Sequence, residues 1–285
     1  MRKRDTLWLA VLVISAAGAG CMFMKYLSAA EAYRRERAVY EGLREQYDPA
    51  AGQHKDPTEE KFRELTVGGY FDPVTGRFYD PGERSIDADE GPGSAECAVV
   101  PEFVRRFLEE YDAGVGWIVL DGTEISYPFM QAEDNEYYLR RAPSGEYLRA
   151  GSLFLDCRCG RDMKDPNSII YGHHMKDGSM FRGLDDYRSR DFFESHTSGI
   201  LYLKDRALRL DIAACMNIGS TDRIIYDNRS DTARIMEYAG KHALCFRNTE
   251  VGPEGRILTL STCSYSYAGE RTVLIAVIRE AAQTA

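Results

Sequence analysis

The sequence lacks the loops that usually hold phosphate groups or a reactive serine. It contains no glycine-rich nucleotide-binding loop and no G-x-S-x-G turn. It also lacks an excess of positive charge, since 36 Lys and Arg stand against 45 Asp and Glu, for a formal net charge of -9. A chain of this sign offers no electrostatic footprint for a phosphate backbone, so we expect no nucleic-acid partner.

A zinc-type cysteine pattern is missing as well. Cys157 and Cys159 form a C-x-C, but no second pair follows at ligand spacing, and Cys215 and Cys245 stand alone. We therefore expect no metal site. The chain has 7 cysteines, an odd number, so at least one is unpaired if all stay within the chain. A disulfide outside the membrane stays open among five of them: Cys97, Cys157, Cys159, Cys215 and Cys245.

One long apolar run is present, at the N-terminus. Arg2, Lys3 and Arg4 precede the uncharged stretch "LWLAVLVISAAGAGCMFM". We interpret residues 6–27 as a transmembrane anchor, residues 1–5 as a cytoplasmic tail, and everything beyond as extracellular. A cleaved signal peptide is the alternative, because Ala-Gly-Ala-Gly supplies small residues. A lipoprotein signal would use Cys21, but Gly18 stands where such signals carry a bulky aliphatic residue.

Residues 28–98 form the next region. The Ala, Glu and Arg of residues 28–48 recur at helical spacing and predict a solvated stalk. Two prolines then end the helix, and "GGYFDPVTGRFYDPGE" predicts a small hairpin around Thr75–Gly76. The acidic, glycine-rich Asp87–Glu96 has the composition of a linker.

Residues 99–285 predict a mostly β domain. "PEFVRRFLEEYD" places Phe103, Val104, Phe107 and Leu108 on one helical face. Eight short apolar runs follow and predict a closed or nearly closed β-barrel or a sandwich. One amphipathic helix, around "DTARIMEYAGKHAL", interrupts them. The eight runs are "GWIVL", "ISYPFMQ", "GSLFL", "NSIIYG", "GILYL", "RLDIAACMNI", "RILTLST" and "TVLIAVI".

Two of these strands end on residues that can carry chemistry. In "ILTLSTCSY" the leucines predict a core face, whereas the face shared by Ile257, Thr259, Ser261 and Cys263 turns polar, as if that end opened to solvent. "SIIYGHH" ends on His173 and His174, which alternation places on opposite faces. Arg271 opens the last strand, and it lands near the Cys263 sulfur if that strand folds back beside the cysteine strand.

These segments resemble the sortases, most closely class B, from about Val99 to Ile278. "GWIVLDGTEISYPFMQAEDNEYYL", "AGSLFLD", "IIYGHHMKDGSMF" and "LTLSTCSY", followed by Arg271, occur in the family's order. The resemblance implies an eight-stranded sortase-type β-barrel with an N-terminal helical extension and a helix between late strands. It implies Cys263 as nucleophile, His173 as acid/base partner, Arg271 as oxyanion- or substrate-positioning cation, and substrate contacts from three residues, Leu139, Ser261 and Thr262. His174 matches no catalytic position.

The resemblance also implies partners and a cellular place. The substrate would be a sorting signal such as N-P-x-T-N or x-P-x-T-G on a surface protein or pilin of Gram-positive bacteria, cut after threonine. The acceptor would be an amine of a peptidoglycan precursor or of a pilin, with no cofactor required. "PVTG" (Pro73–Gly76) itself resembles the core of such a signal, although Pro and Gly at turn positions favour a plain hairpin over a self-occluding segment.

Two alternatives remain from other classes. Another cysteine enzyme of the cell wall is disfavoured, since the S-x-G-C-R run of L,D-transpeptidases is absent and papain-like peptidases place Cys before His. An anchored scaffold that keeps the fold without catalysis would not need all three of Cys263, His173 and Arg271.

Overall fold

A computed structural model describes residues 100–252, 254–263 and 270–280, the strands of a small hairpin, and the helical positions 31, 38–40 and 42–43; of Cys263 and the hairpin it describes the backbone. The chain divides into two compact units, Met1–Leu43 and Arg44–Ala285. Among the described residues, no helix is both long and apolar enough to cross a membrane. The predicted anchor, residues 6–27, lies outside them, as do Asp87–Glu96 and most of the predicted stalk.

The hairpin prediction is confirmed. Strands β1 (Tyr70–Asp72) and β2 (Arg77–Tyr79) pair antiparallel with Phe71 opposite Phe78. The turn between them, residues 73–76, lies outside the described residues. The resemblance of this turn to a sorting-signal core therefore stays a prediction.

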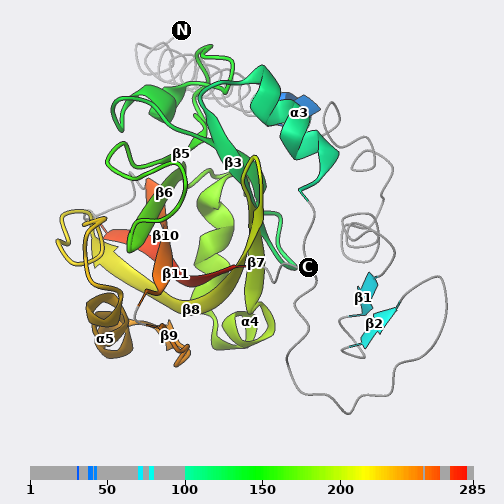
Figure 1. The fold of residues 1–285 in the computed structure, drawn as a ribbon. Helices are drawn as coiled ribbons and strands as arrows, with labels where there is room; N and C mark the ends of the chain where they lie inside the picture. Colours follow the sequence, from blue (N-terminus) through cyan, green and yellow to red (C-terminus); the bar gives the residue numbers. More distant parts are fainter. Residues whose placement is uncertain are drawn as a thin grey trace, which may run out of the picture. The chain divides into compact units, whose positions relative to one another are not determined.

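A closed sheet forms the body of the second unit (Figure 1). Eight strands pair in the order β11-β10-β6-β5-β4-β3-β7-β8, and β8 also pairs with β11, which closes the sheet. The two-residue β9 pairs with β8 on the edge opposite β11. The predicted eight-stranded barrel is thus confirmed. Its strands are β3 (Gly114–Leu120), β4 (Ser126–Met130), β5 (Leu153–Leu155), β6 (Asn167–His173), β7 (Ser198–Tyr202), β8 (Ala207–Gly219), β10 (Arg256–Cys263) and β11 (Glu270–Glu280), with β9 at Cys245–Phe246.

Both predicted amphipathic helices are present. In α3 (Glu102–Glu110), Val104, Phe107 and Leu108 are buried, and the Phe107 ring lies edge-on to Trp117 of β3 at 5.6 Å. Helix α5 (Thr232–His242) begins where the Asp231 carboxylate accepts a hydrogen bond from the Ala233 amide at 2.7 Å. The other helical elements are η1 (Tyr137–Arg140), η2 (Phe181–Arg188) and α4 (Arg190–Ser195).

The apolar run of β11 is buried on both faces because two layers cover it. Val273, Ile275 and Val277 pack in a cluster with Ile235 and Ala239 of α5. The alternate residues of β11 are also fully or almost fully buried. A strand covered on both sides has a continuous apolar sequence instead of an alternating one.

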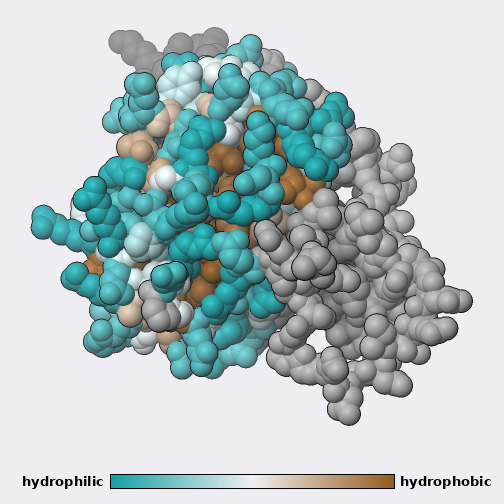
Figure 2. All heavy atoms as spheres, in the orientation of Figure 1, coloured by the Kyte–Doolittle hydropathy of each residue, from teal (hydrophilic) through white to brown (hydrophobic). Residues whose placement is uncertain are grey.

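In Figure 2 the face in view is mostly hydrophilic, with hydrophobic residues showing between the polar ones.

The expectation that this face of β10 opens to solvent toward Cys263 is wrong at Ser261. Ser261 is fully buried, like Ile257 and Thr259 before it, and the side chain of Cys263 lies outside the described residues. Ile257 packs in the cluster beneath α5, and the Ser261 hydroxyl lies 2.9 Å from the Tyr226 hydroxyl. The polar residues on this face bond to segments that are distant in sequence, so their polarity does not mark exposure.

Candidate active site

Three adjacent strands bring the predicted nucleophile, base and cation to one end of the barrel (Figure 1). Strand β10 runs parallel to β6, in a register that pairs the backbone of Cys263 with His173. Strand β11 runs antiparallel beside β10, with Val273 opposite Ser261, so Arg271 lies at the same end. The last strand therefore does fold back beside the cysteine strand, as predicted.

His173 is buried and held by a backbone carbonyl. Its side chain is 6% exposed, and its Nε2 lies 2.6 Å from the Leu139 carbonyl oxygen. A carbonyl only accepts, so Nε2 carries the hydrogen and Nδ1 is the nitrogen that can exchange a proton. Burial lowers the pKa of His173; the Leu139 hydrogen bond opposes this change, while Arg140 and Arg149 add to it. The neutral imidazole is therefore favoured.

Arg271 has no fixed counter-charge in the described part of the chain. None of the carboxylates described there forms an ion pair with it, and its buried Nε has no hydrogen-bond partner among these residues. Its guanidinium carbon lies 5.7 Å from the centre of the Tyr226 ring. A cation held against an aromatic ring keeps its donors available for an incoming carbonyl or carboxylate.

A pocket of about 640 Å³ is lined by Arg271 and by Leu139, the hydrogen-bond partner of His173, whereas His173 itself is not among its lining residues. Leu139, Tyr171, Tyr226 and Arg271 contribute to its walls. The remaining lining residues come from the segment before η1, from β5 and the segment after it, and from the chain after β8: Asn135, Phe154, Arg158, Ser220, Thr221, Asp222, Arg223 and Asp227. Of the three predicted substrate contacts, only Leu139 lines it.

Ser261 and Thr262 use their hydroxyls within the protein. Both side chains are at most 1% exposed. Ser261 bonds to Tyr226, and the Thr262 Oγ1 accepts a hydrogen bond from the Thr272 amide at 3.1 Å. In this structure neither hydroxyl lines the pocket, so their predicted substrate contacts remain predictions.

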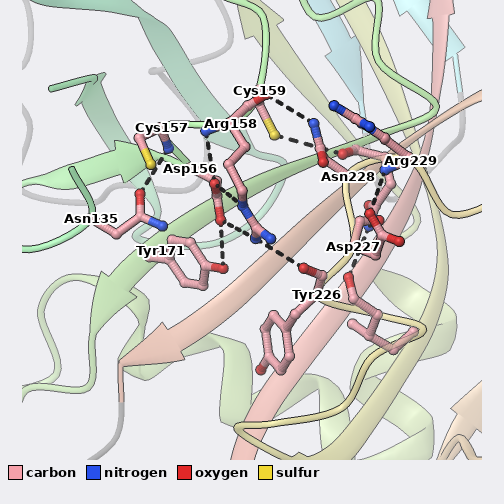
Figure 3. Close-up of polar contacts among 12 residues, drawn as sticks. Asn135, Asp156, Cys157, Arg158, Cys159, Tyr171, Tyr226, Asp227, Asn228 and Arg229 are labelled. Atoms are coloured by element: carbon pink, nitrogen blue, oxygen red, sulfur yellow. Dashed lines mark hydrogen bonds and ion pairs between the residues drawn. The ribbon is translucent and has the colours of Figure 1, made fainter. Parts of the chain in front are cut away.

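One wall of the pocket, held together by hydrogen bonds, was not predicted from the sequence (Figure 3). The fully buried Asp156 accepts two hydrogen bonds from the Arg158 guanidinium, at 2.9 and 2.7 Å, and one from the Tyr171 hydroxyl at 3.0 Å. Burial alone would raise the pKa of Asp156, but these bonds lower it overall, so the carboxylate stays ionised. Arg158 also donates to the Tyr226 carbonyl at 2.9 Å. Tyr171 stands two residues before His173, and that spacing is the one signal that could have revealed the wall.

The opposite face of the same strand ends has different chemistry. The His174 Nε2 lies 2.7 Å from the Asp185 carboxylate, which also accepts a hydrogen bond from the Thr272 hydroxyl at 2.6 Å. His173 and His174 therefore point to different partners, as alternation predicts. None of His174, Asp185 and Thr272 lines the pocket.

Four cysteines outside the predicted site are free thiols. Cys159, Cys215 and Cys245 are buried, whereas Cys157 is exposed near the pocket, with its amide bonded to Asn135. Burial raises the pKa of both Cys159 and Cys215 to about 12, so these two thiols stay protonated at neutral pH. Among the residues that the structure describes, no three His, Cys, Asp or Glu side chains gather as a metal site would require.

Comparison with known proteins gives a consistent family. No family model matches the chain. Sortase B of Listeria monocytogenes is 37% identical over 152 residues, which is 52% of this chain and 62% of that protein. Sortase B of Staphylococcus aureus is 32% identical over 169 residues, which is 58% of this chain and 69% of that protein. The solved Staphylococcus aureus sortase B–substrate complex superposes with a TM-score of 0.58 at 30% identity, covering 64% of this chain and 87% of that one.

Proposed function

The chain belongs to the sortase B family of cysteine transpeptidases, and we propose that its own reaction is the cleavage of a sorting signal followed by transfer of the acyl group to an amine. The signal is NPxTN- or xPxTG-like and is cut after threonine. The acceptor is an amine of a peptidoglycan precursor or of a pilin. The observation that carries the proposal is the register of β6 and β10, which sets the backbone of Cys263 opposite His173.

His173 accepts and donates the proton in each step. A thiolate is the attacking species, so the Cys263 thiol gives its proton to Nδ1 of the imidazole as the sulfur bonds to the threonine carbonyl carbon. The resulting imidazolium then protonates the leaving amine as the peptide C–N bond breaks, leaving a thioester. The Leu139 carbonyl supports this role because it accepts the hydrogen of Nε2, which makes Nδ1 the basic nitrogen of the neutral imidazole.

The acceptor amine reverses these steps. It attacks the thioester carbonyl, gives a proton to His173, and releases the Cys263 sulfur as the new amide bond forms. Arg271 stabilises the negative oxygen in both tetrahedral intermediates. Its permanent charge and the absence of an ion pair with any described carboxylate support this role.

The substrate peptide occupies the pocket lined by Leu139, Tyr171, Tyr226 and Arg271. A relative solved as a sortase B–substrate complex supports the binding of a substrate by this chain. The pocket is open to solvent, and hydrogen bonds to Asp156 hold Arg158 and Tyr171 in its wall, which suits an extended peptide bound along the strand ends.

Cleavage of internally quenched peptides carrying NPxTN or LPxTG tests this function. We expect wild-type protein to cleave one of them and to form a mass adduct with a matching vinyl sulfone peptide. Cys263→Ala should lose both activities. Cys157→Ala is the matched control, because Cys157 is the exposed free thiol near the pocket and should be dispensable. Cleavage that survives in Cys263→Ala would reject the proposed nucleophile, and a wild-type protein that forms no adduct would favour the scaffold alternative.

We propose that the enzyme acts outside the cytoplasm, held by residues 6–27 with the N-terminus inside. The basic residues before the apolar run support this orientation. Protease added to intact cells should remove the domain after Lys25. Complete protection in cells whose surface proteins are digested would reject this topology.

A further inference from the structure

The chain neighbours of all three predicted catalytic residues are joined by hydrogen bonds. His174 follows His173, Thr272 follows Arg271, and Thr262 precedes Cys263. The Asp185 carboxylate binds His174 at 2.7 Å through Oδ2 and Thr272 at 2.6 Å through Oδ1. Thr272 in turn donates its amide hydrogen to the Thr262 hydroxyl at 3.1 Å. We call these four residues, Thr262, Thr272, Asp185 and His174, the Asp185 network.

The fold delivers Asp185 from one short segment. After β6 the chain turns back, so that His174 forms a β-bridge with Met180, and Gly178 adopts the positive φ of +92° that this turn requires. Element η2 then crosses the strand ends and contacts β6, β10 and β11. A Cβ on Gly172 would lie 2.7 Å from the Phe181 ring, so only glycine lets η2 approach β6 this closely.

Asp185 is held as an acceptor in this setting. Its side chain is 23% exposed, and burial alone would raise its pKa. The hydrogen bonds from Thr272 and His174 lower that pKa overall, so the ionised carboxylate holds both partners at neutral pH. An acceptor with two oxygens can hold two strands at once, which a single hydroxyl in this place could not do with equal strength.

We propose that Asp185 is a positioning residue for the transpeptidase reaction: it fixes the ends of β6 and β11 relative to each other and, through Thr272 and Thr262, relative to β10. The inference rests on the proposed function. Because side chains alternate across a strand, the network acts from the face opposite the chemistry and touches no substrate. Its effect is the relative placement of His173, Cys263 and Arg271, in which errors of about 1 Å are costly.

Asp185→Ala is the first test, with Asp186→Ala as its matched control. Asp186 lies next in η2, is 53% exposed, and has one ion pair, with Arg182 at 3.5 Å. Steady-state cleavage of the accepted sorting peptide is measured below the melting temperature of every variant. We expect kcat of Asp185→Ala to fall roughly 10- to 100-fold while KM changes less than about threefold. Asp186→Ala should stay within about twofold of wild type.

Thr272 supplies the second test from the other end of the network. Thr272→Val keeps the shape but removes the hydroxyl, so its kcat should fall in the same way. Thr272→Ser restores the hydroxyl and should recover most of the rate. The double variant Asp185→Ala/Thr272→Val should be no slower than the worse single variant, because both changes break the same link. If Asp185→Ala does not fold, the Val and Ser pair decides alone.

Three results would overturn the proposal: equal kcat in the Asp185 and Asp186 variants, a loss confined to KM, or a serine variant as slow as the valine variant. These results are separable from a failure of the proposed function. Wild-type cleavage with an inactive Cys263→Ala establishes the reaction whatever the Asp185 variants do. A wild-type protein that cleaves no sorting peptide rejects the function itself.

Discussion

The two faces of the β6 end surround neighbouring histidines with opposite chemistry. On the pocket face, His173 binds a neutral backbone carbonyl. On the other face, His174 binds the carboxylate of Asp185. Arg271 of β11, which lines the pocket, has no ion pair with any described carboxylate. Its neighbour Thr272 instead donates a hydrogen bond to Asp185.

This difference places the proposed catalytic residues on one face of the strands and the residues that hold the strand ends on the other. A fixed carboxylate beside Arg271 would pair with the positive charge that the developing oxyanion needs, and one beside the sulfur of Cys263 would disfavour the thiolate by like-charge repulsion. A carboxylate on the far face does neither, yet it ties the strand ends together. Because neighbouring side chains of a strand point to opposite faces, the residue for catalysis and the residue for support are adjacent in sequence. A shift of the strand register by one residue would therefore exchange their positions.

The largest test of the comparison is the histidine pair. His173→Ala removes the proposed general acid/base and should lower kcat/KM by about 10²–10⁴-fold. His174→Ala removes one arm of the Asp185 network and should cost only about tenfold, mainly in kcat. Peptide cleavage by the two variants is compared under identical conditions. An inactive His174→Ala beside an active His173→Ala would mean that the assigned faces are reversed.

Arg271→Lys gives the next largest effect. Lysine keeps the charge but loses the planar fork, so we expect kcat/KM to fall roughly 10²-fold if the arginine binds the developing oxyanion. The melting temperature should hardly change, since no ion pair with a described residue is broken.

Arg279→Lys is its control on the same strand. Arg279 pairs with Asp211 at 3.0 Å at the other end of β11, so cleavage should be unaffected there. Near-normal cleavage by Arg271→Lys would reduce the arginine to a simple positive charge. A large loss of stability would instead make it a structural residue.

Much of the fold follows from local pattern. The eight apolar runs became the eight barrel strands, and the two periodic segments became α3 and α5, because each pattern specifies which face must be buried. Four short elements were missed: β9, α4 and the two 3-10 helices η1 and η2. Strand β9 has two residues, and the apolar residues of α4 are one adjacent pair, Phe192 and Phe193, so neither displays a full period.

Candidate site residues could be chosen from the sequence only where they stand at the ends of strands. His173, Cys263 and Arg271 each end or begin a strand, so their motifs and the pairing of those strands suffice to bring them together. Asp185 and Tyr226 come from connecting segments that reach these strands in the folded protein, and no spacing in the sequence reveals their partners. For the same reason the burial of Ser261 was not predicted, because its partner Tyr226 comes from a distant segment.

Tyr226 offers a smaller test of the pocket face. Its ring lies against Arg271 and stacks on Tyr171 with the ring centres 6.2 Å apart. Tyr226→Leu removes the aromatic face and should lower kcat/KM about tenfold, the size of one cation–π contact. Tyr226→Phe keeps the ring but removes the hydroxyl that lies 2.9 Å from the Ser261 hydroxyl, and should stay within about threefold. Equal losses in both variants would assign the effect to the hydroxyl.

The smallest effect concerns the proton affinity of His173. Burial lowers its pKa, so the imidazole should titrate below the ordinary histidine value of about 6.5. The titration is followed by NMR in Cys263→Ala, where no thiolate can stabilise the imidazolium, and the signal is assigned by its loss in Cys263→Ala/His173→Ala. Because the folded state binds this proton less readily than the unfolded state, the contribution of His173 to stability is complete above about pH 6.5 and is lost as the pH falls below it. A titration above that value would mean that a negative charge stabilises His173, and the pocket face would then resemble the face of His174.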